Sequence, residues 1–345
     1  MIKSLSSELR QSGFDLCHPI DTSWYNDLIQ SEGLIESGAL KRLPESSSSV
    51  VVDNDDEEGD EAPGTINCCN AILIGNTKHI WPFFLSWMST YDQKWSNQGG
   101  LSRLTDPFDN FVEENILCAL ERCLTSSKPT ELDGGRISSY ELFRSDGRRT
   151  MIVINDDGML SYYPHEESFL VSMTRVATTT GKYWNDNEAT KLCVHPEYGT
   201  WTAFRAVVVF TSRGDDSSLS SSPIVITPAP CPRPVSDEEM KIAKSVFNYA
   251  LNGDTENGYG STIGKEWDEL CKYLHGSIVP GSTWEKVPET MKPWIKLRDC
   301  ISIGREKWKY DEPQLLYHYT KDLEILNMEL RRFKDEQRRE DSVSL

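Results

Sequence analysis

Residues 191–210 of the chain read KLCVHPEYGTWTAFRAVVVF, and their pattern is the strongest indication of the fold. The second half predicts a β-strand, because its residues are mostly apolar and the side chains of a strand alternate between two faces. Simple alternation places on one face Trp201, Ala203, Arg205 and Val207. A guanidinium group on such a strand needs a carboxylate, a phosphate or carbonyl oxygens as its partner. Two interpretations of Arg205 stay open: a structural ion pair, or a group that faces a bound anion.

The first half of the segment contains Cys193 and His195, two residues apart on the same predicted strand face. Cysteine and histidine bind zinc, but a structural zinc site usually needs four ligands. No further ligand follows at the usual spacing. The pair alone therefore does not predict a metal site.

The segment resembles the signature of the cobalamin-processing C protein family, the cytosolic proteins of the methylmalonic aciduria and homocystinuria type C defect. The shared pattern is Cys-Val-His-Pro, an aromatic residue before a glycine, and Trp-x-Ala-x-Arg before two valines. Other fragments resemble the family in the same order along the chain: Gly13-Phe14-Asp15 with Trp24-Tyr25-Asn26, Leu104-Thr105-Asp106-Pro107-Phe108-Asp109, Tyr140-Glu141 with Arg148-Arg149, and Phe247-Asn248. Several fragments in the correct order are far more specific than any one of them.

The resemblance implies an α+β fold of the flavin-nitroreductase-like type, with an antiparallel sheet and flanking helices, to which this chain adds a long C-terminal helix. Residues 1–300 would form this domain, and residues 301–345 a helical tail. Residues 41–64 are acidic and low in complexity, so we expect a disordered insertion there rather than an acidic interaction site. Residues 213–222 predict a second low-complexity loop.

The sequence pattern predicts further elements between these segments. Strands are expected at residues 66–74, 136–143, 149–154, 168–180 and 224–227, and the turn at 145–147 makes the second and third of them a hairpin. Helices are expected at residues 106–124, 236–251 and 265–274; Asp106 caps the first, and a capping box at Ser236 begins the second. Residues 156–166 are expected to be a long connection.

The chain from Glu312 onward predicts one long charged helix with an apolar seam. The seam consists of Leu316, Tyr319, Leu323, Leu326, Leu330 and Phe333. Such a stripe serves either a helix that packs on its own domain, which we favour, or a helix that forms a homodimer.

The resemblance implies a function. The protein would bind cobalamin with the lower base detached and remove the upper axial ligand. Cyanocobalamin would be decyanated reductively with FAD or FMN and NADPH, and alkylcobalamins would be dealkylated by attack of a glutathione thiolate. The family's D-type trafficking protein and methionine synthase would be partners. The alternatives are a cobalamin carrier with little turnover, and a flavin reductase that does not use cobalamin.

The resemblance also implies site residues, although it assigns no catalytic residue. Cobalamin contacts fall on Ser139, Ile152, Val153, Ile154, Asn155, His165, Ser172, Met173, Thr174, Cys193 and Phe204. For His165 a surface-loop position is an equal alternative, and at Ser172, Met173 and Thr174 the aromatic residues of the family are missing. Arg205 and Lys292 are the candidates for binding an anion or glutathione, and Lys286, Lys296 and Arg298 are further cations that could substitute in part. The family's other arginine would fall near residues 259–260, where this chain has Tyr and Gly.

Composition limits the remaining possibilities. The net charge is −18, with seven negative charges between Asp53 and Glu61, and no basic stripe is present, so nucleic acid is not expected as a partner. No apolar run is long enough to span a membrane, and the N-terminus lacks the apolar region of a secretory signal. Nine cysteines without a CxxC pattern indicate a reduced, intracellular protein, and the resemblance implies the cytosol.

Overall fold

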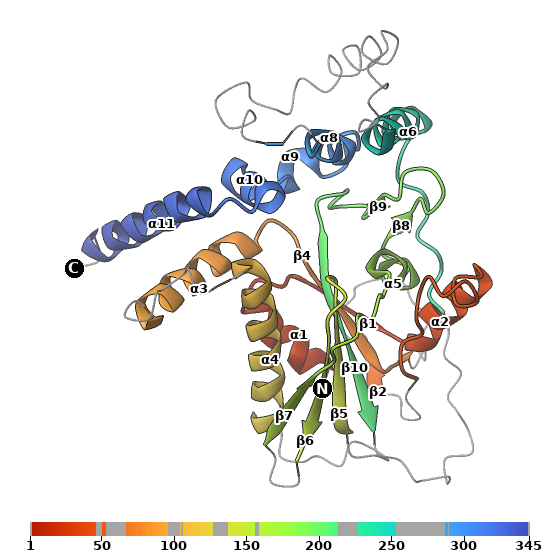
Figure 1. Cartoon of the computed structure of the whole chain (residues 1–345), viewed down its shortest axis with the longest axis horizontal. Helices are drawn as coiled ribbons and strands as arrows, with labels where there is room; N and C mark the ends of the chain where they lie inside the picture. Colours follow the sequence, from red (N-terminus) through yellow and green to blue (C-terminus); the bar gives the residue numbers. More distant parts are fainter. Residues whose placement is uncertain are drawn as a thin grey trace. The chain divides into compact units, whose positions relative to one another are not determined.

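The computed structural model describes residues 2–45, 50–52, 67–95, 104, 106–126, 137–155, 159–212, 227–252, 287–288 and 290–343. The chain forms two compact units, and each is assembled from separate segments (Figure 1). Unit 1 consists of Met1–Asn76, Val112–Tyr183 and Ala203–Cys231. Unit 2 consists of Thr77–Phe111, Trp184–Thr202 and Pro232–Leu345.

A six-stranded antiparallel sheet forms the centre of unit 1, with the strand order β1-β4-β10-β5-β6-β7 (Figure 1). The strands are β1 (Leu16–Ile20), β4 (Ala71–Asn76), β5 (Ile137–Arg144), β6 (Arg149–Ile154), β7 (Leu160–Pro164) and β10 (Ala203–Ser212). The predicted hairpin is confirmed as β5 and β6, whose turn contains Gly147 at φ 83°. The predicted α+β class, with an antiparallel sheet, flanking helices and a long C-terminal helix, is confirmed as well.

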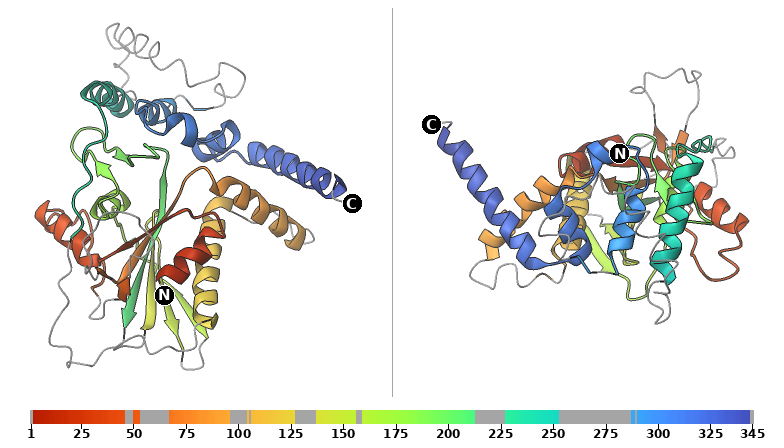
Figure 2. Two further views of the ribbon diagram at one scale, coloured as in Figure 1. Left: turned by 180° about the vertical axis from the view of Figure 1, so that it is seen from behind. Right: turned by 90° about the horizontal axis from the view of Figure 1, so that it is seen from above.

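Helices cover both faces of this sheet. They are α1 (Ile2–Arg10), α2 (Thr22–Ser31), the C-terminal three quarters of α4 (Pro107–Ser126), and α5 (Met173–Thr179). On one face α1 meets α4 where Ser4 Oγ lies 3.5 Å from Cys123 Sγ (Figure 2). This face contains fully buried residues of four central strands, namely Ile72, Ile74, Tyr140, Leu142, Ile152 and Val208. It forms one part of the core of unit 1; on the other face of the sheet, Leu73, Phe143, Val207 and Val209 are fully buried as well.

Two predicted elements of unit 1 are wrong. The connection expected at residues 156–166 contains the edge strand β7, which pairs with β6. The strand expected at residues 168–180 is the helix α5 instead. The mixed apolar and polar pattern of residues 168–180 suggested a strand, but the apolar residues of α5 recur at helical spacing. The hydroxyl of Thr178 also donates to the carbonyl of Thr174 at 2.9 Å, one helical turn earlier.

A short ribbon lies within and beside the insertion that we expected to be disordered. Val50–Val52 form β2 and pair with β3 (Asn67–Cys69), so these three valines are ordered, as their strand propensity favours. The remaining insertion residues from 53 to 64 lie outside the described residues. So do the loop at 213–222, the helix expected at 265–274, and most of the strand expected at 224–227.

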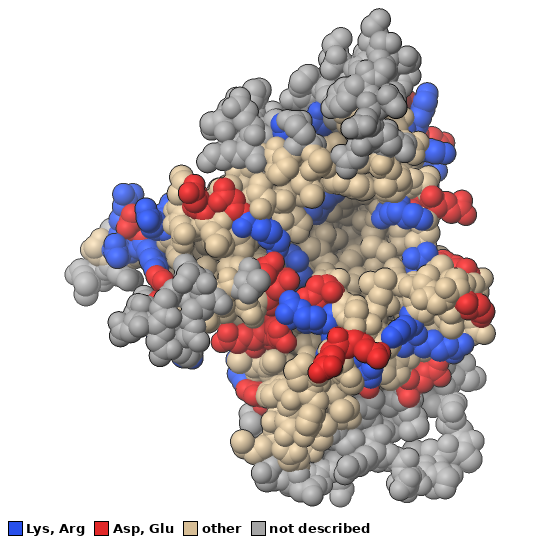
Figure 3. Space-filling model, in the orientation of Figure 1, with Lys and Arg blue, Asp and Glu red and all other residues tan. Residues whose placement is uncertain are grey.

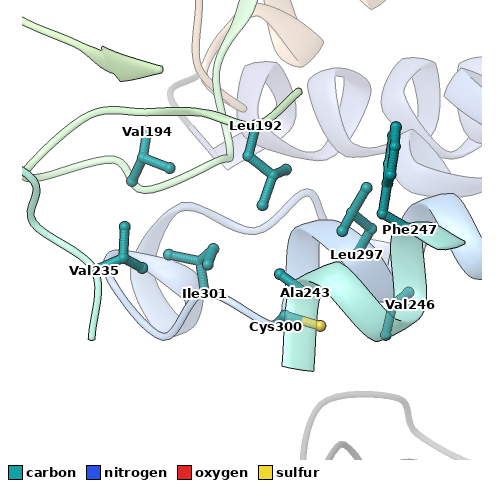
Figure 4. Close-up of a cluster of buried hydrophobic side chains, with 9 residues drawn as sticks. All are labelled: Leu192, Val194, Val235, Ala243, Val246, Phe247, Leu297, Cys300 and Ile301. Carbon is teal, nitrogen blue, oxygen red and sulfur yellow. The ribbon is translucent and has the colours of Figure 1, made fainter. Parts of the chain in front are cut away.

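Unit 2 is mostly helical. Its elements are α3 (Ile80–Trp95), the first turn of α4, β8 (Trp184–Asn185), β9 (Cys193–Val194), α6 (Asp237–Asn252), α8 (Lys292–Asp299), α9 (Arg305–Trp308), α10 (Glu312–Thr320) and α11 (Leu323–Val343). Figure 4 shows how side chains from β9, α6 and α8 form one apolar cluster around Leu192, Val194, Ala243 and Ile301. Among the described residues, no helix has both the length and the apolar composition needed to cross a bilayer.

The predicted helix caps are confirmed. The Asp106 carboxylate accepts the backbone N–H of Phe108 at 3.1 Å and begins α4. Ser236 and Glu239 form the predicted capping box of α6, because each side chain accepts the backbone N–H of the other, at 3.2 and 3.0 Å. The apolar face predicted for α4 is buried from Phe108 to Cys123.

The C-terminal tail is two helices rather than one. Lys321 adopts a left-handed conformation with φ 54° and ends α10. Asp322 then accepts the N–H of Glu324 at 2.7 Å and begins α11. Leu326 and Leu330 are buried, α11 packs against α3, and Lys334 Nζ lies 3.0 Å from an Asp92 oxygen. The favoured interpretation, a helix packed on its own chain, is confirmed for this part of the seam, whereas Leu323 is 46% exposed.

Candidate functional site

A β-bulge at Arg205 determines which side chains of β10 share a face. Phe204 pairs with Gly75 and Ala206 pairs with Ile74, so Arg205 is an extra residue without a place in the ladder. Val207 then pairs with Leu73 and lies on the same face as Phe204. The predicted alternation, which placed Val207 on the face of Arg205, is therefore wrong beyond the bulge.

One partner of Arg205 is an amide. Its Nε donates a hydrogen bond to Oδ1 of Asn76 at 2.7 Å, and Asn76 is fully buried at the end of β4. The carbonyl of Arg205 accepts the N–H of Ser145 at 2.9 Å, which connects the bulge to the β5–β6 turn. These contacts favour the structural interpretation of Arg205, with a carbonyl-type oxygen as its partner.

Four of the expected cobalamin contacts lie on the face of the sheet opposite Tyr140, Ile152 and Val208. Ser139 pairs with Val153 across β5 and β6, and Asn155 follows Val153 on the same face. The register from β5 to β10 places Phe204 on the same side of the sheet, but seven residues before Thr211, the partner of Ser139, and the fully buried Phe143, Val207 and Val209 lie between them. We call the surface defined by Ser139, Val153, Asn155 and Ser161 the open face, because each of these residues keeps part of its surface exposed.

Hydrogen bonding on the open face involves its polar residues. Asn155 Nδ2 donates to Ser161 Oγ at 2.9 Å, and the N–H of Asn155 donates to the carbonyl of Met159. These bonds fix the Asn155 side chain at the end of β6. Ile152 and Ile154 point to the other face, where Ile152 is fully buried, so their side chains contribute to the core.

The expected contacts after β7 lie in different settings. Ser172 is the N-cap residue of α5, and its N–H donates to Tyr25 Oη at 3.2 Å. Met173 is buried and Thr174 is half-buried on the same helix, which packs against β10. His165 follows β7 and is exposed. The surface-loop interpretation of His165 thus describes its surroundings.

Three residues near Phe204, namely Tyr183, His18 and Gly75, could not be identified from the sequence. The fully buried ring of Tyr183 meets Phe204 edge to face at 5.0 Å, and its hydroxyl lies 3.2 Å from Nε2 of His18. Gly75 pairs with Phe204 across β4 and β10, and a Cβ at Gly75 would lie 2.9 Å from the Ala203 carbonyl oxygen. His18 and Tyr183 are 165 positions apart in the sequence, so no local pattern could connect them.

Charged side chains of both signs are interspersed over the face of the molecule drawn in Figure 3. Some form pairs in unit 1, such as Arg175 with Glu32 at 2.6 Å and Arg149 with Glu141 at 2.5 Å. The second pair lies on the face of the sheet that carries Ser139 and Val153. The polar residues there are therefore accompanied by a neutralised ion pair rather than by a single excess charge.

Unit 2 contains the other candidates, Cys193 and Lys292. Cys193 is half-buried on β9, next to the apolar cluster of Figure 4. Lys292 is half-buried at the first position of α8. His195 Nδ1 accepts the backbone N–H groups of Glu197 and Tyr198, at 3.1 and 3.3 Å, which gives this histidine a role in a turn. Within the described parts of the chain, no three His, Cys, Asp or Glu residues gather as metal ligands do.

Arg298, a further cation near Lys292, has a structural role. Its guanidinium donates to the carbonyl of Thr200 through Nε at 3.0 Å and through a terminal nitrogen at 2.7 Å. It also lies 4.3 Å from the ring centroid of the fully buried Trp201. The guanidinium of Arg298 thus holds the backbone at Thr200 and Trp201.

The similarity of this chain to known proteins lies among solved structures. No protein-family model matches the chain, and no curated protein matches it. Among solved structures, it is similar to the crystal structure of a Caenorhabditis elegans B12-trafficking protein, CblC, a human MMACHC homologue. That protein is of the family that the sequence fragments resemble. The TM-score is 0.40 and the identity 14%, over 87% of this chain and 95% of the other. The sequence fragments and the side-chain geometry, rather than this likeness, carry the functional conclusion.

Proposed function

We propose that this protein binds cobalamin on the open face of unit 1, with the lower base detached from cobalt, and removes the upper axial ligand. One observation carries the proposal. Ser139 and the pair Val153 and Asn155 were expected as cobalamin contacts from two separate fragments of the sequence, and the register of the sheet brings these three residues together on one partly exposed surface.

The residues of the open face suit a corrin ring. Val153 offers apolar surface of the kind that lines ligand sites, and the polar groups beside it can fix the orientation of a ligand. Asn155 uses one N–H on Ser161, so its carbonyl oxygen and second N–H can pair with the amide side chains of the corrin. Phe204, farther along the same side of the sheet, would be a separate contact, and its ring packs edge to face against the Tyr183 ring.

The reactions follow from the resemblance and form part of the proposal. Cyanocobalamin is decyanated with electrons from NADPH through FAD or FMN, and alkylcobalamins lose their alkyl group to a glutathione thiolate. The cobalamin supplies the chemistry, and the protein contributes binding, orientation and exclusion of water. The product then passes to a D-type trafficking partner or to methionine synthase.

One titration tests this function. Aquo-, cyano- and methylcobalamin are added to the full chain while visible spectra are recorded, and glutathione, or NADPH with flavin, follows. We expect a shift to the base-detached spectrum and then loss of cyanide or of the methyl group. A shift without ligand loss would leave a carrier, and NADPH oxidation without a shift would leave a flavin reductase.

A further inference from the structure

The histidine of the Cys-x-His pair performs a task that neither a metal site nor a ligand contact explains. Nδ1 of His195 accepts two backbone N–H groups, those of Glu197 at 3.1 Å and Tyr198 at 3.3 Å. The backbones of His195 and Gly199 also exchange a pair of hydrogen bonds, both at 2.9 Å. By accepting these hydrogen bonds, the imidazole thus closes the five-residue turn from His195 to Gly199.

This hydrogen bonding determines the chemical state of the ring. Both groups that approach Nδ1 are donors, so Nδ1 must offer its lone pair, and the proton of the neutral ring is on Nε2. A protonated ring would carry hydrogens on both nitrogens and could accept neither bond. His195 therefore closes the turn only as the neutral Nε2–H tautomer.

Ring contacts and a close backbone approach also hold the turn in place. The His195 ring stacks on Tyr198 with centroids 4.4 Å apart, and Tyr198 meets Trp308 edge to face at 4.7 Å. Gly199 has φ 58°, and a Cβ there would lie 1.9 Å from the carbonyl oxygen of Ile303. Only a backbone without a side chain fits this close approach.

Cys193 lies between Leu192 and Val194, whose side chains are buried in the apolar cluster of Figure 4, and this turn begins two residues after it. Its strand β9 has only two residues, which pair with two residues of β8, and so short a ribbon has little stability of its own. Cys193 is separated from His195 by one residue. We infer that His195 is a positioning residue, which through the closed turn fixes the backbone of Cys193. The inference rests on the proposed function only where Cys193 is taken as a cobalamin contact.

The test compares His195→Ala with His195→Asn in the full chain. Asn is the matched variant, because its Oδ1 takes nearly the place of Nδ1 and accepts backbone N–H groups in the same kind of turn. The first measurement is alkylation of Cys193 by iodoacetamide, followed by peptide mass spectrometry. We expect a rate increase of about threefold or more in His195→Ala, as local opening exposes the thiol, and a rate near that of the wild type in His195→Asn. The half-buried Cys118 of unit 1 is the internal control and should not change.

Two further readouts separate the possible failures. Long-range ¹⁵N NMR of the wild type should show Nδ1 unprotonated, and a proton on Nδ1 would overturn the inference without any ligand. If the wild type shows the base-detached spectrum, His195→Ala should bind cobalamin about tenfold more weakly and His195→Asn about as well as the wild type. Equal alkylation rates in the wild type and His195→Ala would refute the positioning role. Absence of the spectral shift in the wild type would refute only the proposed function.

Discussion

Arg205 and Asn76 are joined by a 2.7 Å hydrogen bond that runs from the bulged residue of β10 to the last residue of β4. The bulge turns the guanidinium away from the face of Phe204 and toward a fully buried amide. An acceptor in that position needs a partner, since unsatisfied buried polar groups are costly. The bond thus keeps Arg205 and Phe204 on opposite faces of the sheet.

Arg205→Ala should lower the free energy of unfolding by about 1.5–3 kcal/mol, the range for hydrogen bonds with a charged donor. Urea denaturation measures the change, and a double-mutant cycle with Asn76→Ala should show that the two losses are not additive. The control is Arg148→Ala. Arg148 lies in the neighbouring turn and its side chain is 56% exposed, so we expect a change of about 0–1 kcal/mol. Wild-type stability together with lost cobalamin binding would instead make Arg205 a ligand contact.

The sequence predicted what local patterns determine. The caps at Asp106 and Ser236, the β5–β6 hairpin and the apolar face of α4 depend on residues a few positions apart, and all are present. The bulge at Arg205 was missed because it depends on a distant partner strand. The helix α5 was missed because its threonines satisfy their hydroxyls on carbonyls one turn back, which removes part of their preference for strands.

The candidate site was predictable to a smaller extent. The resemblance identified Val153 and Phe204, but it treated Ile152, Val153 and Ile154 alike, and only the sheet register separates the core side chains from the exposed one. His18 and Tyr183 required the tertiary fold. The predicted long helix is interrupted at Lys321, which adopts a left-handed conformation. The apolar seam alone does not show this interruption.

Gly199→Ala should be far more destabilising than Gly33→Ala. Both glycines have positive φ, 58° and 67°, so both substitutions cost about 1–2 kcal/mol in backbone strain. Only at Gly199 would the new Cβ overlap a backbone carbonyl, whereas no atom lies within 4 Å of a Cβ at Gly33. We expect a loss above about 4 kcal/mol for Gly199→Ala, measured by thermal or urea unfolding. Equal losses at the two positions would contradict the close approach of Ile303.

Glu239 should make stability depend on pH in the acid range. Burial alone would raise its pKa, but hydrogen bonds from Ser302 and Ser236 outweigh burial and lower the pKa from 4.5 to about 2. The folded pKa is below the unfolded value, so the stabilisation is complete above pH 4.5 and is lost as the pH falls through 2. The melting temperature of the wild type should exceed that of Glu239→Gln at pH 6, and the difference should shrink steadily between pH 4.5 and pH 2. A constant difference would show that the carboxylate charge is unimportant there.

Val153→Asp and Ile152→Asp should fail in different ways, although the residues are adjacent. Ile152 is fully buried in the core, where an unpaired carboxylate is not tolerated, so Ile152→Asp should not fold. Val153 is half-buried on the open face, and Val153→Asp should keep a melting temperature near that of the wild type. It should nevertheless bind cobalamin about tenfold more weakly, as followed by visible spectra, because the carboxylate would face the apolar corrin. If Val153→Asp binds normally, the ligand lies elsewhere.

Lys292 offers a way to test the glutathione part of the proposal. A cation in the first turn of α8 opposes the helix dipole, so the dipole does not explain a lysine at this position. Lys292→Ala should raise the glutathione concentration needed for half-maximal dealkylation of methylcobalamin, and the melting temperature, measured alongside, reports any change in stability. Lys292→Arg should lower that concentration, because arginine provides the bidentate fork that lysine lacks. Lys244→Ala, on the exposed side of α6, is the control and should change neither quantity. Equal glutathione dependence in all four proteins would place the thiol substrate away from α8, and the open face would then have to be assigned a different reductant.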